Sequence, residues 1–495
     1  MCGIHAAISS AAQCPISSAL ERRLRSRGPD HLGTVTTRVG DNDAISLSFT
    51  STVLSLRGDH IAKQPLVDDT TGSVLCWNGE AWKIDGQKVQ GNDGESILSS
   101  LSLASRQSVE DDGRGVLNTL RAIEGPFAFI FFDKPARRLY YGRDRLGRRS
   151  LLVKPGEPFL LASISDASTT GWSEVEADGI YTLHVGGNGI APEHLVPAHL
   201  DWVEDDSLIS GIGAFNTSIP VESDRLTRQA DVIAHLRNHL TESLQLRVLQ
   251  VPIPPKASPT DARIAVLFSG GLDCTVLARL ASDLLPPDQP IDLLNVAFEN
   301  PRIAAQNKGT SQNELGSGLA QTSLESQPES YTTTARVLLS GLGADELFGG
   351  YIRHETAFNR QGYVGLIEEL KLDVSRLGKR NLGRDDRAMA TWEREVRFPY
   401  LDEGFVKWAI ELPVAEKCDF ANIDTSDNRG ETPEPGKRVL RFLAEELGMS
   451  AVAREKKRAG NLKSIEANAG AQIQFGARTA KMESGKVKGT TLISP

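Results

Sequence analysis

The second residue of the chain is a cysteine, in the sequence Met1-Cys2-Gly3-Ile4. If Met1 is removed, Cys2 carries its own α-amino group on the same residue as its thiol. A free α-amine titrates at about pH 8 and can take a proton from a side chain close to it, so an N-terminal cysteine can combine a nucleophile with a base. The position alone does not select catalysis, because any residue can follow Met1.

Two short polar motifs could serve such a nucleophile. Asn78-Gly79-Glu80 follows an apolar run, and Asp93 lies in Gly91-Asn92-Asp93-Gly94-Glu95. Amide groups at Asn78 and Gly79 could stabilise an oxyanion, while the acidic groups could hold a substrate ammonium. The alternative interpretation of Asn-Gly is a hairpin turn, where this dipeptide is common.

Two glycine-rich loops indicate a phosphate site. One is Ser269-Gly270-Gly271-Leu272-Asp273-Cys274-Thr275, and the other is Ser340-Gly341-Leu342-Gly343-Ala344-Asp345-Glu346. Glycines let backbone amides approach a phosphate, a following helix adds positive potential, and Asp273 and Asp345 could hold one divalent cation that bridges phosphates. The Walker pattern G-x-x-x-x-G-K-[ST] is absent, so hydrolysis of a γ-phosphate is not indicated. A tight packing turn is the alternative for either loop.

The elements that must position these residues fall into two domains. Between residues 2 and 205, short apolar runs alternate with turn signals, which predicts strands in stacked sheets. The runs are 44–56, 74–77, 127–133, 139–142 and 150–153. Residues 206–260 are predicted to form a linker and a connecting helix, with Ile233, Leu236, Leu240 and Leu244 at helical spacing.

The second domain is predicted to span residues 261–460. Buried strands at 263–268, 291–298 and 336–339, with a helix at 276–285, predict a doubly wound parallel sheet whose ligands lie at the carboxyl ends of the strands. The region 304–330 is rich in Gln, Asn, Ser and Gly, and resembles a flexible linker where a helix and a strand would be expected. Residues 461–495 are predicted to be a solvated C-terminal tail.

Composition narrows the class of protein. A net charge of -9 and a pI of about 5.6 argue against an extended nucleic-acid surface. The cysteines are odd in number and scattered without a C-x-x-C pair, which favours neither a disulfide framework nor a zinc cluster. They are Cys2, Cys14, Cys76, Cys274 and Cys418. No stretch predicts a membrane span or a signal peptide, so we expect a soluble cytoplasmic protein.

The motifs together resemble those of a known family. Five of them are similar to class II glutamine amidotransferases: Cys2-Gly3-Ile4, Arg27-Gly28-Pro29-Asp30, Asn78-Gly79-Glu80, Phe127-Ala128-Phe129 and Gly142-Arg143-Asp144. The two glycine-rich loops and the segment from Arg384-Asp385-Asp386-Arg387 to Leu401-Asp402 resemble the ATP-pyrophosphatase half of glutamine-hydrolysing asparagine synthetases. The chain resembles in particular the asparagine synthetase domain-containing proteins, a divergent branch of that family.

This resemblance implies the fold and the first site. The fold would be an α+β four-layer sandwich of the N-terminal nucleophile hydrolase type, followed by an α/β doubly wound parallel sheet of the ATP-pyrophosphatase, adenine nucleotide α-hydrolase-like type. Cys2 would attack the amide of glutamine, and Asn78 and Gly79 would form the oxyanion hole. Asn78, Gly79, Glu80 and Asp93 would hold glutamine.

The resemblance also implies the second site and its ligands. Ammonia would pass to a carboxylate, aspartate in the family, that ATP activates as an acyl-adenylate with release of pyrophosphate. Mg²⁺ would sit on Asp273 and Asp345, and Lys456 would neutralise charge in the transition state unless it belongs to a solvated basic run. The implied ATP ligands are Leu267, Ser269, Gly270, Gly271, Asp273, Phe298, Ser340 and Gly341. The expected partners are small molecules (glutamine, aspartate and ATP), with no nucleic acid and no membrane, and a homodimer is left open.

The chain departs from the family pattern at several points. Val53 stands where the family has the arginine that grips the glutamine carboxylate, and Arg57 could substitute from the same strand. Cys274 replaces a serine of the first loop. Leu342 replaces a glutamate implicated in forming the amide, and a leucine cannot accept a proton. The region 304–330 is shorter than in the family.

These departures leave three functions open. The chain could be a glutamine-dependent asparagine synthase, an amide ligase for another carboxylic acid, or a catalytically impaired scaffold or binding protein that keeps the fold. A tRNA-modifying pyrophosphatase shares the first glycine-rich loop, but it fits poorly with the acidic composition and with the amidotransferase motifs.

Overall fold

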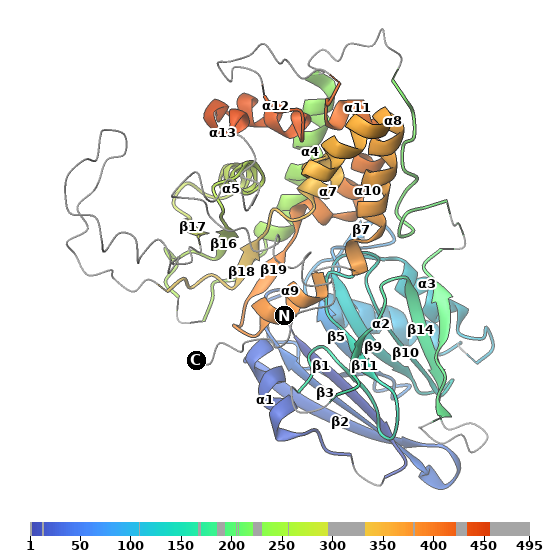
Figure 1. Ribbon diagram of the computed structural model, residues 1–495. Coiled ribbons are helices and arrows are strands. Elements are labelled where there is room, and N and C mark those ends of the chain that lie inside the picture. Colours follow the sequence, from blue (N-terminus) through green and yellow to red (C-terminus); the bar gives the residue numbers. More distant parts are fainter. Residues whose placement is uncertain are drawn as a thin grey trace, which may run out of the picture.

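The computed structural model has two units, a sandwich formed by the N-terminal part of the chain and a second unit formed by the rest (Figure 1). It describes residues 2–11, 14–107, 109–166, 170–185, 194–203, 205, 207–220, 230–255, 257–295, 332–379, 382–421 and 433–455. In Figure 1 the sandwich is coloured blue to green and the second unit light green to red, with α9 (Leu382–Ala390) at their junction.

Two six-stranded sheets, each antiparallel throughout, form the centre of the sandwich. The first has the order β13-β11-β12-β1-β3-β2, with bounds Ser173–Glu174, Leu152–Lys154, Phe159–Ala162, Gly3–Ser9, Ile45–Val53 and His31–Val39. The second has the order β15-β14-β10-β9-β5-β4, with bounds Ala198–Asp201, Gly179–His184, Arg138–Arg143, Phe127–Asp133, Val74–Gly79 and Leu66–Val67. A small sheet of β7 (Gln87–Lys88), β6 (Lys83–Ile84) and β8 (Ile123–Glu124) lies beside them.

Helices cover both outer faces, which confirms the predicted four-layer sandwich. Strand β9 shows why, because alternate residues of a strand point to opposite faces. Ala128, Ile130 and Phe132 pack in the core between the sheets, whereas Phe127 and Phe129 pack in a separate core with α2 (Asp93–Ser105) and α3 (Arg114–Arg121). On the opposite side α1 (Ser18–Arg27) packs on the first sheet.

The second unit contains a parallel sheet of order β17-β16-β18-β19. Its strands are Ile291–Leu294, Ile264–Leu267, Val337–Leu339 and Glu395–Arg397. Because β16 is central and the chain adds strands on both of its sides, the predicted doubly wound sheet is confirmed. The helices are α4 (Ala230–Val248), α5 (Leu272–Leu284), α7 (Ala344–Phe348), α8 (Ile352–Ser375), α9, α10 (Glu403–Glu411), α11 (Val414–Lys417), α12 (Arg438–Glu446) and α13 (Ser450–Arg454).

The structure differs from the sequence prediction in the bounds of some elements and in the packing of helix α4. Helix α5 begins at Leu272 rather than at 276, because the glycines of the loop end at Gly271, whose carbonyl accepts bonds from the Thr275 hydroxyl and the Cys274 thiol. Helix α4, predicted within the connecting segment, packs against α5 and α12 in the core of the second unit. The region 304–330 lies outside the described residues, and so does the tail 461–495.

Buried ion pairs join the two units. The guanidinium of Arg148, on the sandwich, contacts Asp144 at 2.9 Å and Glu403 of α10, and donates to the carbonyls of Leu401 and Gly125. Among the described residues no helix is both long enough and apolar enough to cross a membrane.

We expect Arg148→Met to destabilise the protein by about 3–5 kcal/mol, because it leaves Asp144 and Glu403 buried without their cation. The measurement is the midpoint of urea unfolding. The matched control is Arg25→Met, which removes an exposed pair with Glu21 and should change the free energy of unfolding by less than about 0.5 kcal/mol. Equal effects of the two substitutions would contradict the assigned role of Arg148.

Candidate functional site

Cys2 lies at the start of β1, in the interior of the protein. Its side chain is 8% exposed, and burial raises the pKa of its thiol. The Gln64 amide points at the sulfur with Nε2 3.9 Å from Sγ, and Arg27 Nε donates to the Cys2 carbonyl at 3.3 Å. A Cβ on Gly3 would lie 2.6 Å from Thr52 Oγ1, so the residue after Cys2 has to be small for β1 to lie this close to β3.

Asn78 and Gly79 end strand β5 and pair with Ala128 and Phe127 of β9. The hairpin interpretation of Asn-Gly is therefore wrong. A Cβ on Gly79 would lie 2.2 Å from the Pro126 carbonyl oxygen, so only glycine fits there. The Asn78 side chain is fully buried, and neither its Oδ1 nor its Nδ2 has a hydrogen-bond partner among the described residues. A buried amide that lacks partners is costly, which makes this side chain a candidate to bind a ligand.

Gln64 connects these two groups, and the sequence analysis missed it. Its Nε2 is directed at Cys2 Sγ, while its Oε1 accepts a bond of 2.8 Å from the backbone amide of Trp77, next to Asn78. Strand β1 also packs on β5 across the sandwich. Together these contacts bring Cys2 and Asn78 into one site. A lone glutamine in a loop carries no motif that could have predicted this role.

The two predicted carboxylates lie in the same region. Asp93 Oδ2 accepts bonds from Trp77 Nε1 at 3.0 Å and from the Ala81 amide at 2.8 Å, and burial raises its pKa. Glu80 lies 3.0 Å from Arg397 of β19, in the second unit. Burial raises the pKa of Glu80 to about 8, although Arg397 acts in the opposite direction.

Arg57 does not lie on β3, contrary to the sequence prediction, because that strand ends at Val53. Its guanidinium donates to the carbonyls of Ala81, at 2.8 Å, and Val89, and lies 3.5 Å from Glu80. In this position Arg57 braces the segment that follows Asn78-Gly79.

His60 fastens the neighbouring loop to α2. Nδ1 lies 2.8 Å from Asp59 and Nε2 lies 2.9 Å from Glu95, in the first turn of that helix. Asp93 stands in the same turn. The hydrogen bonds that the His60 ring donates to Asp59 and Glu95 raise the pKa of His60 to about 8. The sequence analysis did not single out this contact.

The two glycine-rich loops lie together at the carboxyl ends of β16 and β18. A Cβ on Gly341 would lie 3.0 Å from the Cβ of Asp273, so the loops touch. Gly270 has φ +76° and faces open space, which leaves room for a ligand beside the N-terminus of α5. Ser269 and Gly271 flank it, and the Ser340 amide donates to the Arg397 carbonyl at 3.0 Å.

Lys437 joins the two acidic residues of these loops. Its Nζ lies 2.8 and 2.9 Å from the carboxylate oxygens of Asp273 and 2.9 Å from Asp345 Oδ1. Burial lowers the pKa of Lys437, but the two carboxylates outweigh it and raise the pKa above its ordinary value. Lys437 was not predicted from the sequence, because a single lysine before a helix carries no phosphate-binding signature.

Two convergent carboxylates fit the oxygen ligands that Mg²⁺ prefers. Asp273 and Asp345 would hold the ion, which would bridge phosphates, provided that Lys437 gives up its place between them. Within the described residues, no group of three His, Cys, Asp or Glu side chains could hold a metal by itself, so phosphate or water oxygens would complete the set.

The remaining predicted residues have mixed positions. Leu267 ends β16 next to the first loop. The Leu342 amide donates to Ser340 Oγ at 3.3 Å, and its partly buried side chain packs on the core of the second unit. Phe298 and Lys456 lie outside the described residues.

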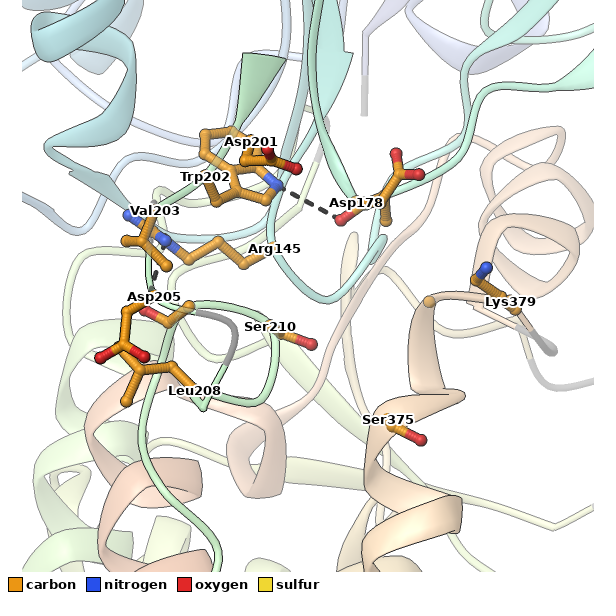
Figure 2. A pocket seen from close by; sticks show the side chains of 13 residues that line it. Arg145, Asp178, Asp201, Trp202, Val203, Asp205, Leu208, Ser210, Ser375 and Lys379 are labelled. Carbon is orange, nitrogen blue, oxygen red and sulfur yellow. Dashed lines mark hydrogen bonds between the residues drawn. The ribbon is translucent and has the colours of Figure 1, made fainter. Parts of the chain in front are cut away.

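A cavity of about 270 Å³ lies elsewhere between the two units (Figure 2). Arg145 stacks on Trp202 at one side of it, and Ser375 and Lys379 line the other. None of the predicted site residues lines this cavity, and its charges are mixed, so it does not contribute to the candidate sites.

Comparison with known families assigns a class to each unit. A family described as a glutamine amidotransferase domain matches residues 1–187, and a family described as asparagine synthase matches residues 330–368 and 359–473. The fold and these matches define a glutamine amidotransferase unit joined to an asparagine synthase unit.

Several curated proteins match most of the chain. The chain is 27% identical to the asparagine synthetase domain-containing protein 1 of Bos taurus, over 99% of this chain and 97% of that protein. It is 28% identical to an asparagine synthetase domain-containing protein of Saccharomyces cerevisiae, over 91% and 87% of the two chains. It is 25% identical to a putative glutamine-hydrolysing asparagine synthetase of Methanocaldococcus jannaschii, over 60% and 58%. The chain is thus similar to asparagine synthetase domain-containing proteins over nearly its whole length.

The contacts of His60 predict how the stability of the loop that carries His60 and Gln64 depends on pH. A raised pKa means that the protonated form stabilises the fold, so this contribution is complete below about pH 6.5 and is lost as the pH rises through about 8. We expect NMR titration of His60, assigned with His60→Gln, to give a pKa of about 8. Glu95→Gln should lower that pKa, and Glu110→Gln, at an exposed glutamate without a bond to His60, should not. An unchanged pKa of His60 in Glu95→Gln would contradict the assigned contact between His60 and Glu95.

Proposed function

We propose that this chain is a glutamine-dependent amidotransferase of the asparagine synthetase type, in which Cys2 releases ammonia and the second unit uses ATP to activate a carboxylic acid. The observation that carries the proposal is the fully buried Asn78 amide, without a partner among the described residues, which Gln64 links to the Cys2 thiol. The cytoplasm is the proposed compartment, supported by the five free cysteines.

In the first site, the Cys2 thiol attacks the carboxamide carbon of glutamine. The α-amine that removal of Met1 would create takes the thiol proton and gives it to the leaving ammonia, so that a thioester forms between Cys2 and the glutamyl group. Water then hydrolyses this thioester, which releases glutamate and restores the thiol. Asn78 and the backbone at Gly79 stabilise the oxyanion, and such donors act strongly in a buried site. Asp93 binds the substrate ammonium, and Glu80 and Arg57 shape the pocket around it.

In the second site, the loops that begin at Ser269 and Ser340 hold the phosphates of ATP. A Mg²⁺ ion on Asp273 and Asp345 would neutralise charge on the phosphates. The carboxylate of the acceptor attacks the α-phosphate, pyrophosphate leaves, and ammonia then displaces AMP to form the amide. Aspartate is the acceptor in the asparagine synthases that the chain resembles.

Leu342 favours an acceptor other than aspartate. Its side chain packs on the core at the place where the family carries a carboxylate. Leucine can neither accept a proton nor bind ammonium, so an acid other than aspartate is the alternative substrate. A catalytically impaired second site, with the fold kept for binding, is the remaining outcome.

We expect Cys2→Ala to abolish glutaminase activity and Asn78→Ala to lower kcat by about 10²- to 10³-fold, because one oxyanion donor is lost. Glutamate release is the measurement. Cys14→Ala is the matched control and should retain activity. Glutamine hydrolysis that survives in Cys2→Ala would refute the first half of the proposal.

We expect Asp345→Asn to lower acid-dependent pyrophosphate release by more than about 10-fold while glutaminase activity stays unchanged. Asp283→Asn, at an exposed ion pair on α5, is the control. Aspartate and a panel of other acids are assayed in parallel, so that the acid that supports pyrophosphate release identifies the acceptor. Failure of every acid would leave only the glutaminase half.

A further inference from the structure

The ammonium of Lys437 occupies the place where a divalent cation would bind. It contacts both oxygens of Asp273 and one of Asp345 at 2.8–2.9 Å. The lysine side chain is 6% exposed, whereas each carboxylate is 20% exposed. The carboxylates are thus reachable from solvent, but the lysine fills the space between them from the protein side.

The backbone that carries Lys437 is held firmly. Its amide donates to the Phe348 carbonyl at 2.9 Å, and its φ of +56° is in the left-handed region. A Cβ on the preceding Gly436 would lie 2.9 Å from the Gly349 carbonyl oxygen, and Arg441 Nε donates to the Gly436 carbonyl at 3.0 Å. Movement of the ammonium must therefore come from rotation about the four carbons of its own stem.

A divalent cation and this ammonium exclude each other. Each needs the same carboxylate oxygens, and two positive charges a few ångströms apart repel each other strongly where solvent is partly excluded. With Lys437 in place, part of the negative charge of the two carboxylates is neutralised, which weakens their hold on a strongly hydrated ion such as Mg²⁺.

We propose that Lys437 is the counter-ion of Asp273 and Asp345 when no nucleotide is bound, and that its ammonium prevents free divalent cations from binding these two carboxylates. When a nucleotide binds, its phosphates pair with the ammonium, and the carboxylates become available to a metal ion. Metal then binds together with the polyphosphate and not before it. The lysine exchanges one set of anionic oxygens for another, so no buried charge is left unpaired during the exchange. This inference rests on the proposed function for the location of the phosphates, but not for the behaviour of the site without them.

The test measures Mn²⁺ binding to the full chain by electron paramagnetic resonance, without nucleotide. Wild-type protein should bind Mn²⁺ weakly, and Lys437→Gln should bind one ion at least about 10-fold more tightly, because the competing charge is gone. Lys407→Gln, at an exposed lysine of α10, is the control and should behave as wild type. Adding Asp345→Asn to Lys437→Gln should remove the gain. Equal Mn²⁺ affinity in wild type and Lys437→Gln would overturn the proposal.

A second measurement needs no variant at the site. Inorganic pyrophosphate, the product released in the proposed reaction, should raise the Mn²⁺ affinity of the wild-type protein by at least about 10-fold beyond the affinity of pyrophosphate alone for the metal. If Lys437→Gln does not fold, absence of this effect overturns the proposal. The counter-ion role of Lys437 and the proposed ATP site can be tested separately. A higher Mn²⁺ affinity in Lys437→Gln without any effect of pyrophosphate supports the counter-ion role of Lys437 but not the ATP site. Acid-dependent pyrophosphate release with equal Mn²⁺ affinities supports the ATP site but not the counter-ion.

Discussion

A buried chain of alternating charges between the two units is the interaction on which both sites depend. It starts at the carbonyl of Cys2 and ends at Glu80, two residues after Asn78. Its members, in order, are Cys2 O, Arg27, Asp386, Arg149, Glu395, Arg397 and Glu80. Breaking such a chain leaves charges buried without partners, which costs far more than the net gain from forming it. The chain therefore fixes where the units dock more than it adds to stability.

This arrangement makes the Cys2 site incomplete without the second unit. Asp386 holds Arg27, which holds the Cys2 carbonyl, and Arg397 compensates for part of the burial of Glu80. Loss of Arg397 would leave the carboxylate of Glu80 more prone to take a proton, since burial already raises its pKa to about 8. The buried charges of the amidotransferase unit thus depend on partners in the second unit, although its two sheets and the core between them are formed by its own residues.

The sequence predicted what depends on local chemistry. Glycine-rich loops after apolar strands, and Asn78-Gly79 after another, have local signatures, and the structure places them at strand ends as such signatures require. Gln64 and Lys437 could not be predicted in the same way, because their roles come from partners far along the chain. The position of Arg57 was misjudged for a related reason: β3 ends at Val53, and the apolar pattern continued past that end.

Strand β19 contacts both candidate sites, the one around Cys2 and the one at the glycine-rich loops. Side chains alternate along a strand, so Glu395 and Arg397 point to the same side, toward the sandwich. The backbone of β19 serves the other site, because its pairing with β18 continues into the bond from the Ser340 amide to the Arg397 carbonyl. Arg397 thereby contacts Glu80 through its side chain and the loop that begins at Ser340 through its main chain. A shift of that loop by a ligand must act on the same strand that holds the Cys2 site together.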